Sequence, residues 1–149
     1  MNAPDRVLLS NMLAIRRGEE TDLPEISAMQ SAAPEAAQWD PADYLAYDLR
    51  VAVSAGRVSG FLVSRSVAPG EYEILNLVVS PDFRRKGVAS GLLRQYLAGI
   101  NGVVYLEVRE SNTAAQNLYK LFNFKEVDTR SGYYSHPLEA AIVMKFHSC

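Results

Sequence analysis

Apolar residues alternate along this chain with caps and turn residues in a way that predicts short strands and helices. Strands are indicated where aliphatic and aromatic residues run without helical spacing, and Ala55-Gly56 between two such runs predicts a hairpin. Helices are indicated where a capping residue and an early proline precede the apolar positions, as at Asp40-Pro41. The expected strands are 12–17, 50–54, 57–65, 71–80, 102–108, 124–130 and 139–146, and the expected helices are 20–30, 38–49, 88–98 and 111–122.

The resulting order, β-α-α-β-β-β-α-β-α-β-β, predicts the α/β (α+β) class with a mixed, mostly antiparallel central sheet. No repeat, linker or low-complexity stretch divides the chain, so we expect a single domain over residues 1–149. Residues 1–10 show no periodicity and are expected to form a loose lead-in.

Composition narrows the possible partners. A formal net charge of −2 argues against general nucleic-acid binding, because no excess of cations is available to displace counterions from phosphates. No apolar run approaches the ~20 residues of a membrane span, and the first residues lack a signal-peptide core. The one cysteine, Cys149, cannot build a disulfide framework, so we expect a cytoplasmic protein.

Three consecutive cations, Arg84, Arg85 and Lys86, stand directly before Gly87 and the predicted helix 88–98. A helix start already carries partial positive charge and unpaired N–H groups, so cations there gain nothing from the helix itself. The N–H groups of about residues 85–90 could hold a phosphate or pyrophosphate. Cations on a solvated loop before an amphipathic helix are an equally good interpretation of these residues alone.

The wider sequence resembles a known family. The stretch LVVSPDFRRKGVASGLL is similar to the acetyl-CoA motif of the GNAT N-acetyltransferases, with Arg84-x-x-Gly87-x-Ala89 for their [QR]-x-x-G-x-[GA]. Residues 105–127 and 132–144 resemble the RimI group, whose members acetylate the N-terminus of a small-subunit ribosomal protein. The resemblance covers about residues 12–146 and implies the GNAT fold, with six to seven strands and about four helices.

The resemblance also implies how a coenzyme binds. The diphosphate of acetyl-CoA would lie on the N-terminus of helix 88–98, and the pantetheine arm would pair with the backbone of the preceding strand. Asn112 would hydrogen-bond the coenzyme, or act only as a helix cap. The implied binding residues are Leu77, Val78, Val79, Arg84, Arg85, Lys86, Gly87, Val88, Ala89, Ser90 and Asn112.

Glu107 is the candidate base that would take a proton from the acceptor amine. It lies on the face of strand 102–108 opposite the aliphatic residues, where an apolar environment would suit a base. It could equally face water. The L-E-V-R sequence shared with the RimI group favours the catalytic role, and Glu73 on the neighbouring strand is the rival base.

Tyr119 is the candidate acid that would protonate the leaving thiolate. A tyrosine on an amphipathic helix is also an ordinary core residue, but the match to N-x-x-A-x-x-[LF]-Y favours the acid role. The only cysteine is Cys149, and His136 and His147 lie in no serine–aspartate pattern, so we expect direct transfer in a ternary complex. These residues also make no metal-ligand set.

Four aromatic residues are candidates for the acceptor groove: Trp39, Tyr44, Tyr133 and Tyr134. Each matches an aromatic position of the family, and each could instead fill the core. Two positions depart from the RimI group, because Gln38 stands where proline is usual and Ala140 where aspartate is usual. The missing carboxylate bears more on the protein substrate than on acetyl transfer.

The expected activity is transfer of acetyl from acetyl-CoA to a primary amine, most simply a protein N-terminal α-amino group. The alternatives are a small-molecule amine or a lysine side chain as acceptor, or a coenzyme-binding module without turnover. The presence of Glu107, Asn112 and Tyr119 weighs against the last, since such a module could lose them. The sequence leaves monomer and homodimer open.

Overall fold

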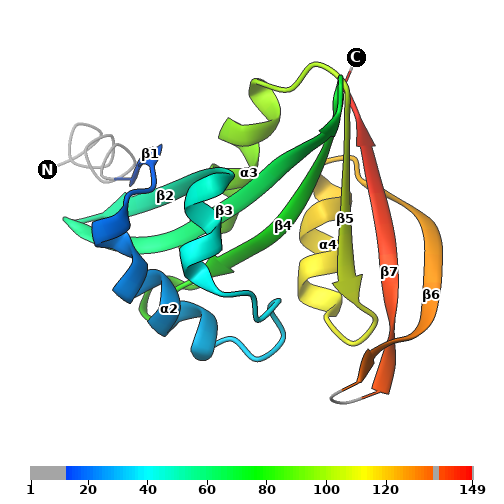
Figure 1. The fold of residues 1–149 in the computed structure, drawn as a ribbon, viewed down its shortest axis with the longest axis horizontal. Coiled ribbons are helices and arrows are strands. Elements are labelled where there is room, and N and C mark those ends of the chain that lie inside the picture. The colour runs from blue at the N-terminus through cyan, green and yellow to red at the C-terminus, as the bar shows by residue number, and fades with distance from the viewer. Residues whose placement is uncertain (1–12, 136–137, 149) are drawn as a thin grey trace, which may run out of the picture. The chain divides into compact units, whose positions relative to one another are not determined.

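The computed structural model of the chain describes residues 13–135 and 138–148 (Figure 1). Its strands form one mixed sheet in the order β1-β2-β3-β4-β5-β7-β6. The strands are β1 (Leu13–Arg17), β2 (Asp48–Ser54), β3 (Arg57–Ala68), β4 (Glu71–Val79), β5 (Val103–Arg109), β6 (Lys125–Ser135) and β7 (Leu138–His147). The helices are η1 (Glu20–Asp22), α2 (Leu23–Ser31), η2 (Pro41–Ala46), η3 (Pro81–Phe83), α3 (Val88–Ala98) and α4 (Thr113–Leu121), where η marks a 3-10 helix.

The strand pairing confirms the predicted fold class. β4 and β5 are parallel, joining Glu71–Ile74 to Val103–Leu106, whereas β1 with β2, β5 with β7, and β6 with β7 are antiparallel. The expected lead-in at residues 1–10 lies outside the described residues. None of the helices within them has the length and apolar content that a membrane crossing requires.

The chain divides into two compact units, each made from two segments. Unit 1 comprises the residues up to Val63 together with Asn76–Gln95, and unit 2 comprises Ser64–Leu75 together with Tyr96 onward. Strands β3 and β4 each contribute to both units. The single domain expected over residues 1–149 stays a prediction.

In unit 1, helix α3 begins where the sequence predicts and buries Leu92 and Leu93 completely. Its first residue, Val88, lies against the backbone of β3 at Gly60. A Cβ at Gly60 would stand 2.9 Å from a Val88 methyl group and 2.9 Å from the Val78 carbonyl oxygen. The missing side chain therefore lets the start of α3 lie close to the sheet, which fixes the position of the loop before it.

In unit 2, α4 and strands β5, β6 and β7 build the second core (Figure 1). Alternate residues of β5, namely Val104, Leu106 and Val108, are buried, as their spacing predicts. The rings of Tyr119, Phe124 and Phe146 follow one another at 5.5 Å between centroids and join α4 to β7.

Two predicted helix starts differ in detail. Segment 20–30 opens with a 3-10 turn, and the Asp22 carboxylate does not cap α2, because it binds the Arg16 guanidinium and the Glu19 N–H instead. Segment 38–49 forms only the 3-10 helix η2. Asp40 caps it as predicted, accepting from the Ala42 N–H, but the chain turns into β2 before an α-helix can form.

The Arg16–Asp22 pair predicts an acid-sensitive contribution to stability. The two guanidinium–carboxylate contacts of 2.8 and 2.9 Å, followed by the Glu19 N–H, hold the pKa of the nearly buried Asp22 below its usual range. Because the folded pKa is depressed, the contribution is present above the unfolded pKa and is lost as pH falls through the folded one. Asp22→Asn should lower the free energy of unfolding by about 1–3 kcal/mol at pH 7.

Urea unfolding at pH 7 and near pH 3 measures that contribution, and the difference between parent and Asp22→Asn should shrink at the lower pH. The matched control is Asp82→Asn, which breaks the well-exposed Arg57–Asp82 pair and should change stability by less than about 0.5 kcal/mol. Equal effects of the two substitutions would contradict the assignment.

Candidate functional site

The loop between β4 and α3 in unit 1 adopts the backbone that an anion-binding turn requires. Gly87 has φ 79° and Arg85 has φ 62°, so both lie in the left-handed region that favours glycine. The Gly91 N–H donates to the Gly87 carbonyl at 2.9 Å as the first helical bond of α3. The backbone N–H groups in the first turn of α3 therefore have no acceptor within the helix. That first turn contains no acidic residue.

Of the three predicted cations before this helix, Arg84 has a long carboxylate contact and Lys86 lies beside an aromatic ring. Arg84 lies 3.9 Å from Glu35 and its Nε is 3.5 Å from the Val79 carbonyl oxygen. The Lys86 ammonium stands 5.6 Å from the centre of the Phe83 ring. The structure therefore leaves positive charge beside the N-terminus of α3, as the phosphate-binding interpretation requires. Of the coenzyme candidates on β4, Val78 is buried, and Leu77 and Val79 are half-buried.

A buried polar network fixes the other functional segment of unit 1. The Asn76 amide donates to the Ala37 carbonyl at 2.9 Å, to Gln30 Oε1 at 3.2 Å and to the Tyr44 hydroxyl at 3.2 Å. The Tyr44 hydroxyl donates to Gln30 Oε1 at 2.5 Å, and its ring packs on Phe61. Burial raises the pKa of Tyr44, with its bond to Asn76 acting in the opposite direction.

This network contradicts the prediction that Tyr44 contacts the acceptor. With 1% of its surface exposed, Tyr44 is a core residue, and its hydroxyl is occupied by Gln30 and Asn76. Trp39 differs, because 54% of its surface is exposed. Gln30 holds the Trp39 carbonyl with a hydrogen bond of 2.5 Å, so the segment is fixed while the indole remains accessible.

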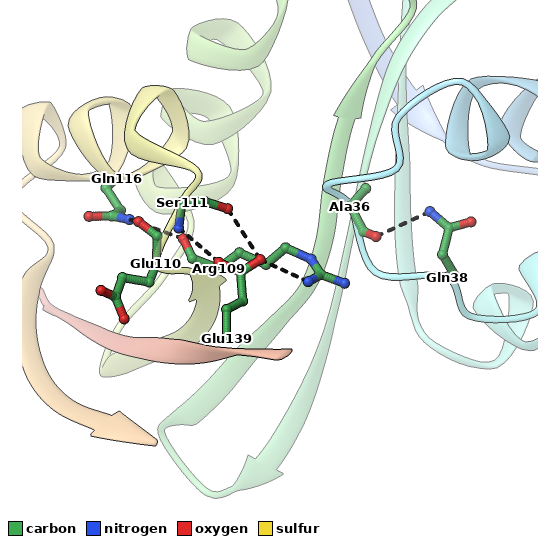
Figure 2. A network of polar contacts seen from close by, with 7 residues as sticks. All are labelled: Ala36, Gln38, Arg109, Glu110, Ser111, Gln116 and Glu139. Atoms are coloured by element: carbon green, nitrogen blue, oxygen red, sulfur yellow. Dashed lines mark hydrogen bonds and ion pairs between the residues drawn. The ribbon is translucent and has the colours of Figure 1, made fainter. Parts of the chain in front are cut away.

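Gln38, which replaces the usual proline, has a structural role. Its amide donates to the carbonyls of Gln30, Ala33 and Ala36 at 3.1–3.2 Å, and Figure 2 shows the bond to Ala36. Proline restricts a loop through its ring, whereas Gln38 restricts this loop through hydrogen bonds. The departure therefore preserves a fixed backbone before Trp39.

In unit 2, Glu107 lies among polar partners. Its carboxylate is 2.9 Å from Nη1 of Arg130, and the Tyr133 hydroxyl also donates to it. The side chains of Glu107 and Arg130 are 19% and 54% exposed. The apolar environment expected for Glu107 was therefore wrong, because β6 places a guanidinium and a phenol against the open face of β5.

The paired tyrosines of β6 lie on this cluster. Their rings meet edge to face with centroids 5.1 Å apart, Tyr133 half-exposed and Tyr134 less so. The hydrogen bond to Glu107, followed by burial, raises the pKa of Tyr133. Burial, followed by the charge of Glu107, raises the pKa of Tyr134, and the Arg109 guanidinium stands 4.1 Å from the Tyr134 ring centre.

A second ion pair holds the end of β5. Glu139 accepts from Arg109 at 2.9 Å, from the Ser111 N–H at 3.0 Å and from its hydroxyl at 3.2 Å (Figure 2). The bond from Arg109, followed by that from the Ser111 N–H, lowers the pKa of Glu139. Gln116 reaches back to the carbonyls of Arg109 and Glu110, which ties α4 to this turn.

The same turn explains why Ala140 is tolerated structurally. The backbone carbonyl of Ala140 accepts from the Glu110 N–H at 3.0 Å, a contact that does not depend on its side chain. The aspartate usual in the RimI group is therefore not needed to close this turn.

Helix α4 and its N-cap supply two further predicted residues. Asn112 is its N-cap, with Oδ1 accepting from the Ala115 N–H at 3.2 Å, which establishes the cap role and leaves the coenzyme contact a prediction. Tyr119 is 7% exposed. Burial, with a smaller effect of Tyr134, raises the pKa of Tyr119 well above its usual range, so the phenol keeps its proton at neutral pH.

Glu73, the rival base, is also ion-paired, at 2.8 Å from Arg65. Unit 2 thus brings Glu107, Tyr133 and Tyr134 into one cluster and adds Arg130, which sequence reasoning missed. In the described part of the chain, no group of three histidine, cysteine or acidic side chains could hold a metal ion.

The chain is similar in sequence to a known family and to named proteins. A family model described as the acetyltransferase (GNAT) family matches residues 13–124. The N-alpha-acetyltransferase RimI of Mycobacterium tuberculosis is 40% identical over 85 residues, which are 54% of this chain and 54% of that protein. The [ribosomal protein bS18]-alanine N-acetyltransferase of Escherichia coli is 33% identical over 95 residues, 60% of this chain and 64% of that protein. The chain thus matches less than two thirds of either relative's length.

Solved structures extend the similarity to nearly the whole chain. The ribosomal-protein-S18-alanine N-acetyltransferase from Escherichia coli has a TM-score of 0.78 at 28% identity, covering 91% of this chain and 94% of that one. Ard1 from Thermoplasma volcanium has a TM-score of 0.85 at 26% identity, covering 93% and 99%.

Proposed function

Because this chain belongs to the acetyltransferase (GNAT) family, we propose that it transfers acetyl from acetyl-CoA to the N-terminal α-amino group of a protein. The observation that carries the proposal is the cluster of unit 2, in which a held carboxylate, Glu107, lies beside the partly exposed Tyr133. The names of the two relatives, one an N-alpha-acetyltransferase and the other acting on an alanine of ribosomal protein bS18, support this acceptor class. We place the reaction in the cytoplasm, with a small-subunit ribosomal protein as partner.

The loop of unit 1 fits the diphosphate of the coenzyme. Gly87 and Arg85 hold the left-handed backbone, the first-turn N–H groups of α3 have no helical partner, and no carboxylate lies in that turn. The side chains of Arg84, Arg85 and Lys86 supply positive charge. We assign the backbone of Leu77–Val79 to the pantetheine arm, and the side chain of Asn112 to the coenzyme in addition to its cap.

The chemistry needs three proton transfers around one direct attack. Glu107 accepts the first proton that the ammonium loses, and the neutral amine nitrogen then forms a bond to the acetyl carbon while the carbon–sulfur bond breaks. Tyr119 gives its proton to the departing sulfur, and the second proton that the nitrogen loses as the amide forms restores the Tyr119 phenol. Acetyl-CoA supplies the activated acyl group, and Trp39, Tyr133 and Tyr134 are assigned to the acceptor.

A substitution pair at Gly87 tests the coenzyme loop. Gly87→Glu should abolish acetyl-CoA binding, because it places a carboxylate and a strained L-residue where a diphosphate approaches. Gly87→Asn is the control, since asparagine tolerates positive φ and a Cβ at this position meets nothing within 4 Å. Calorimetric titration with acetyl-CoA measures both. Binding by Gly87→Glu as tight as that of the parent would show that the loop is wrongly assigned.

Thiol release from acetyl-CoA tests the function as a whole. The acceptors are a panel of N-terminal peptides, lysine-containing peptides with a blocked N-terminus, polyamines and aminoglycosides. Turnover with unblocked peptides is expected. Turnover only with blocked peptides or small amines would favour the other acceptor classes, and tight coenzyme binding without any turnover would favour a binding module.

A further inference from the structure

The candidate base Glu107 is ion-paired with an arginine, Arg130, to which no role has yet been assigned. Arg130 comes from β6, two strands away from β5 in the sheet order, and its Nη1 reaches Glu107 Oε1 at 2.9 Å. Opposite Arg130 on the intervening strand β7 is Ala141, a small residue. The guanidinium also stands 5.7 Å from the centre of the Tyr133 ring, so its position is held from two sides.

Two of the other charged residues near Glu107 are ion-paired with partners. Arg109 on the same strand is paired with Glu139, and Glu73 on β4 is paired with Arg65. The residue opposite Glu107 on β7 is Val143, which carries no charge. On the same face, Lys145 of β7 lies opposite Tyr105 with its ammonium 5.6 Å from the centre of that ring, and Asp128 of β6 lies opposite Val143. From β6 the further groups facing Glu107 are Arg130 and the two neutral phenols Tyr133 and Tyr134, and α4 adds the neutral Tyr119 near Tyr134. Arg130 is thus a cation in direct contact with the candidate base, at 2.9 Å.

A carboxylate alone is a poor environment for a nucleophilic amine. A negative charge stabilises the ammonium form and so raises the pH at which the amine loses its proton. A positive charge beside the same carboxylate has the opposite effect on an amine bound there. For a half-exposed guanidinium within a few ångströms, a shift of about one pH unit is the expected size.

Resting on the proposed function, we propose that Arg130 is a positioning residue that offsets the charge of Glu107, so that an acceptor amine bound there loses its proton at a lower pH than it would beside the carboxylate alone. The effect returns the pKa of a bound α-amino group toward its ordinary value of about 7.7–8.0, close to neutral pH, whereas a lysine side chain near 10.4 stays protonated with or without Arg130.

The proposal is tested by measuring kcat as a function of pH. The peptide substrate is chosen so that the acetyl-transfer step, and not product release, limits turnover. The kcat profile reports groups in the complex, whereas the kcat/KM profile reports the free enzyme and free peptide. Because a cation is removed, Arg130→Gln should move the rising inflection of kcat to higher pH by about one unit. Arg130→Lys keeps the charge and should restore most of the shift.

Arg65→Gln is the matched control, because Arg65 makes an equivalent pair with Glu73 in the same unit, at 2.8 Å and with 45% and 27% of the side chains exposed. Its kcat profile should superimpose on that of the parent. A shift in Arg65→Gln but not in Arg130→Gln would overturn the proposal and make Glu73 the base. A uniform fall of kcat at every pH in Arg130→Gln would reduce Arg130 to a structural residue.

The same measurements separate this inference from the function on which it rests. A parent protein that turns over peptides, with Arg130→Gln and parent profiles superimposed, contradicts the role of Arg130 alone. A parent protein that releases no thiol with any peptide contradicts both. Thermal melting of Arg130→Gln within a few degrees of the parent shows that the variant is folded.

Discussion

Tyr119→Phe should lower kcat and kcat/KM together by about 10²–10⁴-fold, the range for a lost general acid. The phenylalanine ring keeps the contact with Phe124, so stability and coenzyme affinity should barely change. Burial raises the pKa of Tyr119, which means that the phenol is protonated throughout the neutral range. The loss should therefore be the same from about pH 6 to pH 9.

A second acyl donor separates proton donation by Tyr119 from space filling. A thioester with a more acidic thiol needs less help when its sulfur departs, so the deficit of Tyr119→Phe should shrink with that donor. Steady-state rates of parent and variant with acetyl-CoA and with the activated thioester give the two ratios. An unchanged deficit would mean that Tyr119 only orients the coenzyme and that water protonates the sulfur.

Glu107→Gln should lower kcat/KM by about 10²-fold or more, and most strongly at low pH, where the amine is most protonated. Glutamine has nearly the same shape and can still meet Arg130 and Tyr133 with its amide, so the cluster should keep its arrangement. Rates measured across pH 6 to 9 with an N-terminal peptide provide the comparison.

Glu73→Gln is the control for Glu107→Gln. It breaks a comparable arginine pair on β4 and removes only the smallest of the effects on the pKa of Tyr133, so its activity should stay near that of the parent. A large loss in Glu73→Gln with a silent Glu107→Gln would exchange the roles of the two carboxylates.

Features set by neighbouring residues were predictable from the sequence. The start of α3 follows from Gly87, and the hairpin after β2 follows from Ala55-Gly56, whose φ values of 50° and 79° suit a tight turn. The cap at Asn112 and the outward face of Glu107 follow from short-range pattern in the same way. Each of these depends on a few adjacent side chains, which is why one sequence suffices.

Features set by distant residues were not predictable. Tyr44 is buried because Gln30 and Asn76 meet its hydroxyl, and these three residues lie far apart in the chain. Arg130 reaches Glu107 from β6, a strand whose register with β7 shifts between Glu126 and Asp128 and again between Arg130 and Tyr134. Such irregularities change which side chains face β5, and no periodicity announces them.

The central claim is tested most directly by determining which nitrogen of a single peptide carries the acetyl group. The peptide carries one α-amino group and one internal lysine, and it is incubated with acetyl-CoA and the parent protein before fragment mass spectrometry. The same peptide with a blocked N-terminus is the control. The expected result is one acetyl group on the α-amino nitrogen and none on the blocked peptide. Acetyl on the lysine side chain, or no acetylated peptide at all, would contradict N-terminal acetylation by this protein.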